Sequence, residues 1–250
     1  MSRLSPAQRS FARKTAALVV AAAGAHLAAA RPTSGPAATE YALLRAQMGE
    51  HLTELKALHS VELKIARKRE ILPEYTHHVR AVIDSAEKTG RALEDEVFIQ
   101  IMVWVFDVGE YRDGLIMAAH ALRFKVPMPS RFSSTVAAFV ADTLGDAALS
   151  AVTLSGDKLP DFNPQILQHA LDLTEGADMA DQARAKLHKA LGLLMARTAQ
   201  VADKDTNGPA GLARAAREEA VTHLKRAYAL HEKIGVKKEL DALESALRRA

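Results

Sequence analysis

Apolar residues recur every three or four positions along most of the chain, which is the spacing of one face of an α-helix. In the first half this spacing is followed by Leu44, Met48, Leu52, Leu55, Leu58 and Ile65. The pattern predicts one long amphipathic helix from Thr39 to Leu72, which Pro73 ends. A helix of this length exceeds the globular average, so its apolar stripe also predicts a homo-oligomer.

The same spacing, together with residues that start or end helices, predicts helices along the rest of the chain. One ends at Gly90 and another begins at Asn163-Pro164, a cap followed by a first-turn proline. The run 97–106 is almost wholly apolar, and its period alone fits a buried strand as well as a helix. Acids just before it and Gly109 just after it favour a helix. No convincing strand remains, and the predicted fold is all-α.

Changes in composition divide the chain into five segments. Residues 1–36 read as a basic, alanine-rich arm, 37–90 as the long helix and a second one, 91–200 as a helical core, 201–211 as a flexible insertion and 212–250 as a C-terminal helix pair. Gly109-Glu110-Tyr111 followed by Ala118 and Ala121 resembles part of a tetratricopeptide hairpin. This partial match indicates a multi-helix array of helical hairpins, partly tetratricopeptide-like, without assigning a repeat.

Composition places the chain among globular proteins and excludes several kinds of chemistry. It has 250 residues, of which 48% are apolar and 25% charged, so wholesale disorder is excluded. The absence of cysteine excludes disulfides, thiol catalysis, iron–sulfur clusters and cysteine-ligated zinc. The net charge of +3 is mild, so its distribution along the chain is more informative than the total.

Residues 1–31 have two interpretations. Basic residues precede a weakly apolar stretch, and Ala28-Ala29-Ala30 would allow signal-peptide cleavage. Alanine is a weak membrane residue and His26 interrupts the stretch, which favours a basic helix or arm instead. No other segment approaches transmembrane length by this reading, so a soluble protein that does not bind membranes is expected.

The sequence predicts no catalytic residue, metal ligand or cofactor. It contains neither of the glycine-rich motifs that bind nucleotide phosphates. Glu62-Leu63-Lys64 matches the E-x-K fragment of metal-dependent nucleases, whose chemistry needs both charged residues on one strand face. Within a helical pattern these two residues lie on roughly opposite faces. The neighbours His77 and His78 diverge in the same way, and the remaining histidines sit singly within helical patterns.

Two clusters of charge carry the functional prediction. The basic cluster includes a stripe at helical spacing, formed by Lys56, Lys64, Arg67 and Lys68, with Arg69 at its edge. It also includes the basic residues of the acid-free N-terminal arm, Arg9, Arg13 and Lys14. A solvated surface is one interpretation of this stripe, and contact with the phosphates of duplex DNA is the functional one. The stripe lacks interleaved aromatics, which disfavours stacking on single strands. An acidic cluster, predicted to face a protein partner, comprises Asp107, Glu110 and Asp113.

Short motifs in a fixed order across nearly the whole chain resemble a known family. They include Ser5-Pro6-Ala7-Gln8-Arg9, Lys68-Arg69-Glu70-Ile71-Leu72-Pro73, Met102-Val103-Trp104 with Asp107-Val108-Gly109, and Arg184-Ala185-Lys186-Leu187-His188-Lys189. The sequence resembles the terminase small subunits of temperate, contractile-tailed phages, whose members are also named terminase endonuclease subunits. Because the similarity begins inside residues 1–31, it also disfavours a signal peptide.

The resemblance implies a viral DNA-packaging protein in the cytoplasm of the bacterial host. Such a protein binds double-stranded phage DNA at the cohesive-end or packaging site, assembles as a homo-oligomer and recruits the large ATPase subunit of terminase. Three hypotheses remain open. The chain is a non-catalytic DNA-recognition subunit, an endonuclease that itself cleaves concatemeric DNA at the cohesive-end site, or a helical scaffold that binds only protein.

Overall fold

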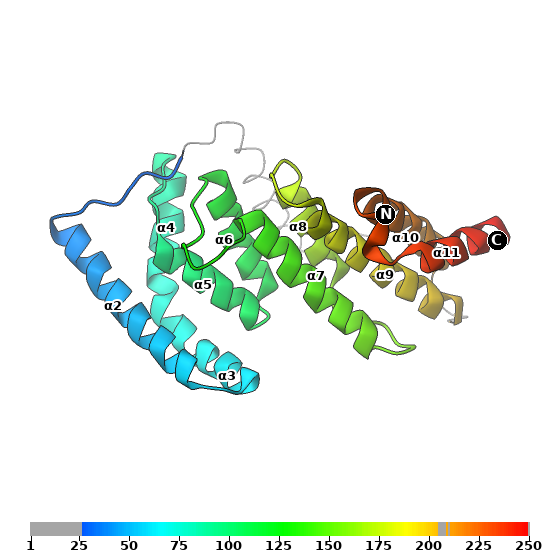
Figure 1. Ribbon diagram of the computed structural model, residues 1–250, viewed down its shortest axis with the longest axis horizontal. Helices are drawn as coiled ribbons and strands as arrows, with labels where there is room; N and C mark the ends of the chain where they lie inside the picture. The colour runs from blue at the N-terminus through cyan, green and yellow to red at the C-terminus, as the bar shows by residue number, and fades with distance from the viewer. Residues whose placement is uncertain (1–26, 205–208, 210, 250) are drawn as a thin grey trace. The chain divides into compact units, whose positions relative to one another are not determined.

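The computed structural model describes residues 27–204, 209 and 211–249 (Figure 1). In these residues the chain is helical and contains no strand beyond an isolated bridge between Ala29 and Leu93. The predicted all-α fold is therefore confirmed. The chain divides into two compact units, Met1–Val136 and Ala137–Ala250, and this division falls inside the segment predicted as one helical core.

The first unit is built around a single buried helix. Its elements are α2 (Pro36–Ala57), α3 (Val61–Ile71), the 3₁₀ turn η2 (Leu72–Tyr75), α4 (Thr76–Thr89), α5 (Glu96–Asp107) and α6 (Tyr111–Arg123). Every residue of α5 from Val97 to Phe106 is buried, and the helix packs against α2, η2, α4 and α6. The ambiguous apolar run is therefore a core helix. Asp95 caps its start, and Gly109, with φ of +87°, lies just beyond its end.

The continuous helix predicted from Thr39 to Leu72 is wrong. α2 ends at Ala57, the backbone of Leu58 is extended, and α3 begins at Val61. Ser60 is the N-cap of α3, because its hydroxyl oxygen accepts a hydrogen bond from the Leu63 amide at 3.3 Å. The apolar spacing continues across this break, so periodicity alone does not reveal the capping serine that starts a new helix.

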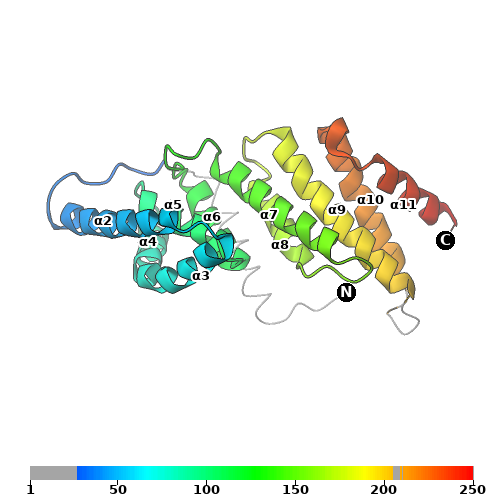
Figure 2. The same cartoon turned by 60° about the horizontal axis from the view of Figure 1, so that its bottom comes forward.

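The second unit is an array of helices. Its elements are α7 (Val136–Leu154), α8 (Pro164–Thr174), α9 (Asp181–Lys204), α10 (Leu212–Leu230), the 3₁₀ turn η3 (Glu232–Ile234) and α11 (Lys237–Arg249). α9 and α10 lie side by side in both Figures 1 and 2, and α9 also packs against α8. Asn163 caps α8 as predicted, through its side-chain oxygen and the Gln165 amide. The tetratricopeptide resemblance stays a prediction.

Helix α7 corrects the expectation that no segment after the N-terminus approaches transmembrane length. Among the described residues, α7 is long and apolar enough to cross a membrane by length and composition alone. A core helix of a soluble protein has the same property. One face of α7 is fully buried within the protein, at Val140, Ala141, Leu144 and Ala148. This packed face is typical of a core helix.

Candidate nucleic-acid interface

The predicted basic stripe is divided between two helices. Lys56 lies in the last turn of α2, whereas Lys64, Arg67, Lys68 and Arg69 lie in α3. Because the chain is extended between the helices, the spacing from Lys56 to Lys64 does not place them on one helical face. The basic residues of the N-terminal arm, Arg9, Arg13 and Lys14, lie outside the described residues.

Arg67 of α3 pairs with acidic residues on both helices. Its Nε and Nη2 atoms donate to the two carboxylate oxygens of Glu54 in α2 at 2.9 and 3.0 Å. Its Nη1 atom donates to Glu70, one turn further along α3, at 2.9 Å. These hydrogen bonds, first with Glu54 and then with Glu70, raise the pKa of the Arg67 guanidinium above its ordinary value. Arg67 therefore fixes the corner between α2 and α3.

The next two basic residues contact the C-terminal end of α5. The Lys68 ammonium lies 2.5 Å from the carboxylate of Asp107, and Arg69 donates to the Val108 carbonyl at 3.1 Å. Cations are favourable at this end of a helix, where the carbonyl groups carry partial negative charge. The structure thus brings a predicted DNA contact, Lys68, onto a predicted partner contact, Asp107. The two charge clusters meet at this ion pair.

Four described residues of the two clusters, Lys56, Lys64, Glu110 and Asp113, differ from Lys68 and Asp107. Lys56 and Lys64 form no hydrogen bond or ion pair within the part of the chain that the structure describes. Glu110 is the N-cap residue of α6, Asp113 lies in its first turn, and both are exposed. Over the described residues, the surface therefore combines unpaired cations on α2 and α3 with exposed acids at the start of α6.

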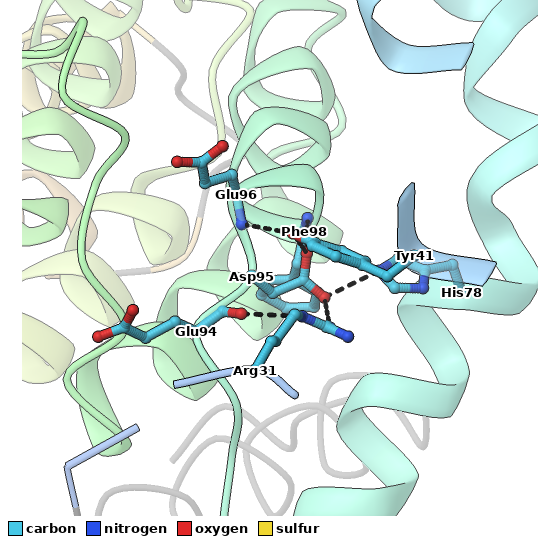
Figure 3. A network of polar contacts seen from close by, with 7 residues as sticks. All are labelled: Arg31, Tyr41, His78, Glu94, Asp95, Glu96 and Phe98. Carbon is cyan, nitrogen blue, oxygen red and sulfur yellow. Dashed lines mark hydrogen bonds and ion pairs between the residues drawn. The ribbon is translucent and has the colours of Figure 1, made fainter. Parts of the chain in front are cut away.

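A buried polar network connects several elements of this unit, and sequence spacing did not predict it (Figure 3). Asp95 is only 2% exposed and accepts a hydrogen bond from the Phe98 amide at 2.9 Å as the N-cap of α5. The same carboxylate accepts from the Tyr41 hydroxyl at 3.1 Å and contacts His78 Nε2 at 2.9 Å. It also pairs with the guanidinium of Arg31. One side chain thus connects α2, α4, α5 and the segment before α2.

Arg31 is held by three different contacts. Besides pairing with Asp95, it donates to the Glu94 carbonyl at 2.9 Å, and its guanidinium lies 3.7 Å from the centre of the Tyr41 ring (Figure 3). Burial acts to raise the pKa of Asp95, but the bonds from His78 and Phe98 and the nearby charges lower it below its ordinary value. Burial and the Asp95 charge raise the pKa of Tyr41 to about 12. The network therefore favours an ionised Asp95 and a neutral Tyr41.

Comparison with known proteins identifies the family. A family model described as phage small terminase subunit matches residues 45–182. The terminase endonuclease subunit of Escherichia phage P2 is 32% identical over 244 residues, which cover 98% of this chain and 86% of that relative. The chain belongs to the phage small terminase subunit family. The family resemblance predicted from the sequence is thus confirmed, and the chain is a phage DNA-packaging protein. No solved structure matches it.

The matched region of this small terminase subunit includes both charge clusters. Residues 45–182 contain the basic residues of α2 and α3 and the acids at 107–113, whereas Arg9, Arg13 and Lys14 precede the match. Glu62 and Lys64 lie in α3, so the E-x-K fragment is helical as argued. Within the described ranges, no group of three or more histidine, aspartate or glutamate side chains is arranged to hold a metal ion.

Proposed function

We propose that this small terminase subunit binds duplex phage DNA at the packaging or cohesive-end site through the cations at the corner of α2 and α3. These cations, called the corner cations below, are Lys56, Lys64, Arg67, Lys68 and Arg69. The observation that carries the proposal is that Lys56 and Lys64 have no acidic partner among the described residues, whereas three other cations of α3 are held in place by the fold. Family membership supports it, because a packaging protein acts on DNA.

The acids at the corner determine how DNA would bind. Glu54 and Glu70 neutralise part of the charge of Arg67, and Asp107 neutralises that of Lys68. Lys56 and Lys64 therefore make the first phosphate contacts, since no carboxylate in the described part of the chain shares their charge. Each cation that contacts a phosphate releases condensed counterions, which favours binding at low salt. The N-terminal arm, with Arg9, Arg13 and Lys14, adds to the proposed DNA interface.

We infer that the large terminase subunit is recruited through the acids at the start of α6. Glu110 and Asp113 are exposed and have no cationic partner within the described ranges, whereas Asp107 is paired with Lys68. An acidic surface repels DNA, so DNA binds at the corner cations and the acids stay accessible to a protein partner. Charge reversal at Glu110 and Asp113 should therefore abolish pull-down of the large subunit while DNA binding persists. Intact pull-down would contradict this assignment.

The proposal includes a homo-oligomer in the host cytoplasm. Apolar side chains on α2 and α3 are exposed in the single chain, with Leu43 and Val61 69% exposed and Leu63 57% exposed. Contacts between copies would remove this apolar surface from water. Light scattering should show an oligomer at micromolar concentration, and replacing Leu43 and Leu63 by glutamine should shift it toward monomer. A monomeric wild-type chain would contradict the proposal.

The DNA interface is tested with a double variant that removes only unpaired charge. Lys56→Gln with Lys64→Gln should reduce affinity for duplex DNA and lower the log–log salt slope by about two units. Lys88→Gln with Arg91→Gln removes the same charge from the end of α4 and the following loop, so it serves as the matched control. If both double variants keep the wild-type slope while circular dichroism shows intact helices, the corner cations do not contact DNA.

A second candidate function is cleavage of DNA by this chain itself. The observation that favours it is the name of the phage P2 relative, a terminase endonuclease subunit. Purified chain is incubated with cohesive-end DNA and Mg²⁺ in the absence of the large subunit. Specific cleavage that is lost when one acidic residue is replaced would establish the enzyme. Intact DNA under conditions in which the chain is bound would favour the recognition subunit.

A further inference from the structure

The second unit contains a polar pocket that the proposed DNA interface does not use. The pocket has a volume of about 400 Å³ and lies between α8, α9 and α10. Its charged and titratable lining residues are Asp172 of α8 and Glu175 just beyond its end, Arg184 and His188 of α9, and His223 and Arg226 of α10. This volume is large enough for a phosphate group together with a small attached group.

Two histidines form a direct pair in the lining. The Nδ1 atoms of His188 and His223 lie 3.0 Å apart, and the two rings stack with centroids 5.2 Å apart. A hydrogen bond between these atoms requires one ring to donate and the other to accept. Burial lowers the pKa of both rings, and for His188 the charges of His223, Arg226 and Arg184 lower it further, to about 4. Both rings are therefore neutral at pH 7.

The cations and the acids of the pocket differ in what they contact. The positive charges of Arg226 and Arg184 both help to lower the pKa of His188. Asp172 already accepts a hydrogen bond from the Gln168 amide at 2.7 Å, and Glu175 is exposed at the end of α8. Arg184 is fixed by donating to the carbonyls of Thr174 and Ala177, both at 3.0 Å. The wall formed by α9 and α10 is thus the basic side of the pocket.

We propose that this pocket binds a phosphate group, on the wall formed by Arg184, His188, His223 and Arg226. Arg226 supplies a charged donor that has no hydrogen-bond or ion-pair partner within the described residues. The phosphate is carried either by a small phosphate ester or by the backbone of DNA. The proposal is independent of the corner cations, because it concerns other residues in the other compact unit.

Protonation of the histidine pair would accompany binding. An anion beside the rings stabilises their charged form, so it raises their pKa and draws a proton from solvent. The donor ring can take this proton at Nε2, which keeps the Nδ1 hydrogen bond and leaves an N–H at the Nε2 of both rings. Binding should therefore tighten as the pH falls. Sulfate, which does not titrate in this range, separates this effect from the titration of phosphate itself.

The test follows the histidine side chains of the full-length protein by nitrogen-detected NMR during titration with inorganic phosphate. The resonances of His188 and His223 should shift saturably, with no such response to chloride at equal ionic strength. Arg226→Gln should weaken the response about tenfold, because a charged hydrogen bond is lost. Arg214→Gln is the matched control on α10, since Arg214 is also exposed but pairs with Glu218 away from the pocket.

The two sources of the phosphate are distinguished by further titrations. If thymidine monophosphate shifts the histidine resonances and duplex DNA does not, the ligand is a small phosphate ester. If duplex DNA causes a matching shift, the ligand is a backbone phosphate. The proposal is overturned if phosphate causes no saturable shift. It is equally overturned if Arg226→Gln and Arg214→Gln respond alike. Because Arg226 is exposed, its replacement leaves the packing between α9 and α10 intact, and circular dichroism confirms the fold.

Discussion

The ammonium of Lys68 lies 2.5 Å from the carboxylate of Asp107, which joins α3 to the last residue of α5. The Lys68 side chain is only 15% exposed, so the pair is partly shielded from water and salt. This contact links two clusters that the linear sequence presents as separate, one basic and one acidic. The negative charge of Asp107 lowers the positive potential around Lys68, a candidate phosphate contact. Removing this charge therefore measures how much it weakens DNA binding.

Asp107→Asn should increase the affinity for duplex DNA. The substitution keeps the shape of the side chain and releases the Lys68 charge, for a gain of up to about fivefold. Fluorescence anisotropy with labelled duplex at low salt measures the change. Asp113→Asn removes the same charge from an exposed position without a cationic partner in the described part of the chain, and should give a smaller gain. Equal gains in the two variants would indicate a general charge effect.

The sequence predicted the helices well where local signals and burial agree. Gly90 ends α4 as expected, because its backbone conformation suits the end of a helix. Asn163 starts α8 as expected, because its side chain caps the first turn. The helix prediction failed between α2 and α3, because the apolar spacing continues on both sides of Ser60 and does not reveal that this residue caps a new helix. The partners of Asp95 could not be predicted either. Arg31, Tyr41 and His78 lie 64, 54 and 17 positions away, and no local spacing encodes such contacts.

Asp95→Asn should destabilise the first unit by about 2–3 kcal/mol. Asparagine still caps α5, so the loss reports the buried negative charge that faces Arg31 and His78. Urea unfolding followed by circular dichroism measures it, with exposed Glu94→Gln as the control. Because folding lowers the pKa of Asp95, its stabilisation is present above the ordinary value of 3.8 and declines as the pH falls through the folded pKa. Asp95→Asn should remove this decline.

His120 should make the protein less stable in mild acid. The ring is 3% exposed between Phe98 and Phe124, and its Nε2 atom has no hydrogen-bond partner in the described structure. Burial is the main cause that lowers its pKa from 6.5 to about 4. Between these two pH values the unfolded chain gains a proton that the folded protein excludes. The free energy of unfolding should therefore fall by about 1.4 kcal/mol per pH unit from this group alone.

His120→Leu tests this contribution through the pH dependence rather than the absolute stability. The apolar side chain takes up no proton, so the slope of unfolding free energy against pH should be shallower between 6.5 and 4. Denaturant unfolding at several pH values provides the slope. His77→Gln, at an exposed position of α4, is the matched control. A wild-type slope in His120→Leu would show that His120 binds its proton in the folded state as readily as in the unfolded chain.

Gly192→Ala should destabilise the second unit, because α10 leaves no room for a side chain at this position of α9. An added Cβ would lie 2.7 Å from the Cγ and Cδ2 atoms of Leu224 and 3.2 Å from the Ala220 carbonyl oxygen. Both neighbours are fully buried, so the Leu224 side chain must move or the helices must separate, at an expected net cost of about 1–3 kcal/mol. Gly49→Ala is the control, since its Cβ would meet no atom within 4 Å, and alanine should stabilise α2 by about 0.5–1 kcal/mol. Thermal unfolding of both variants measures these opposite shifts. If Gly192→Ala raised the melting temperature as Gly49→Ala does, helix propensity would outweigh packing, and the close approach of α9 and α10 would be wrong.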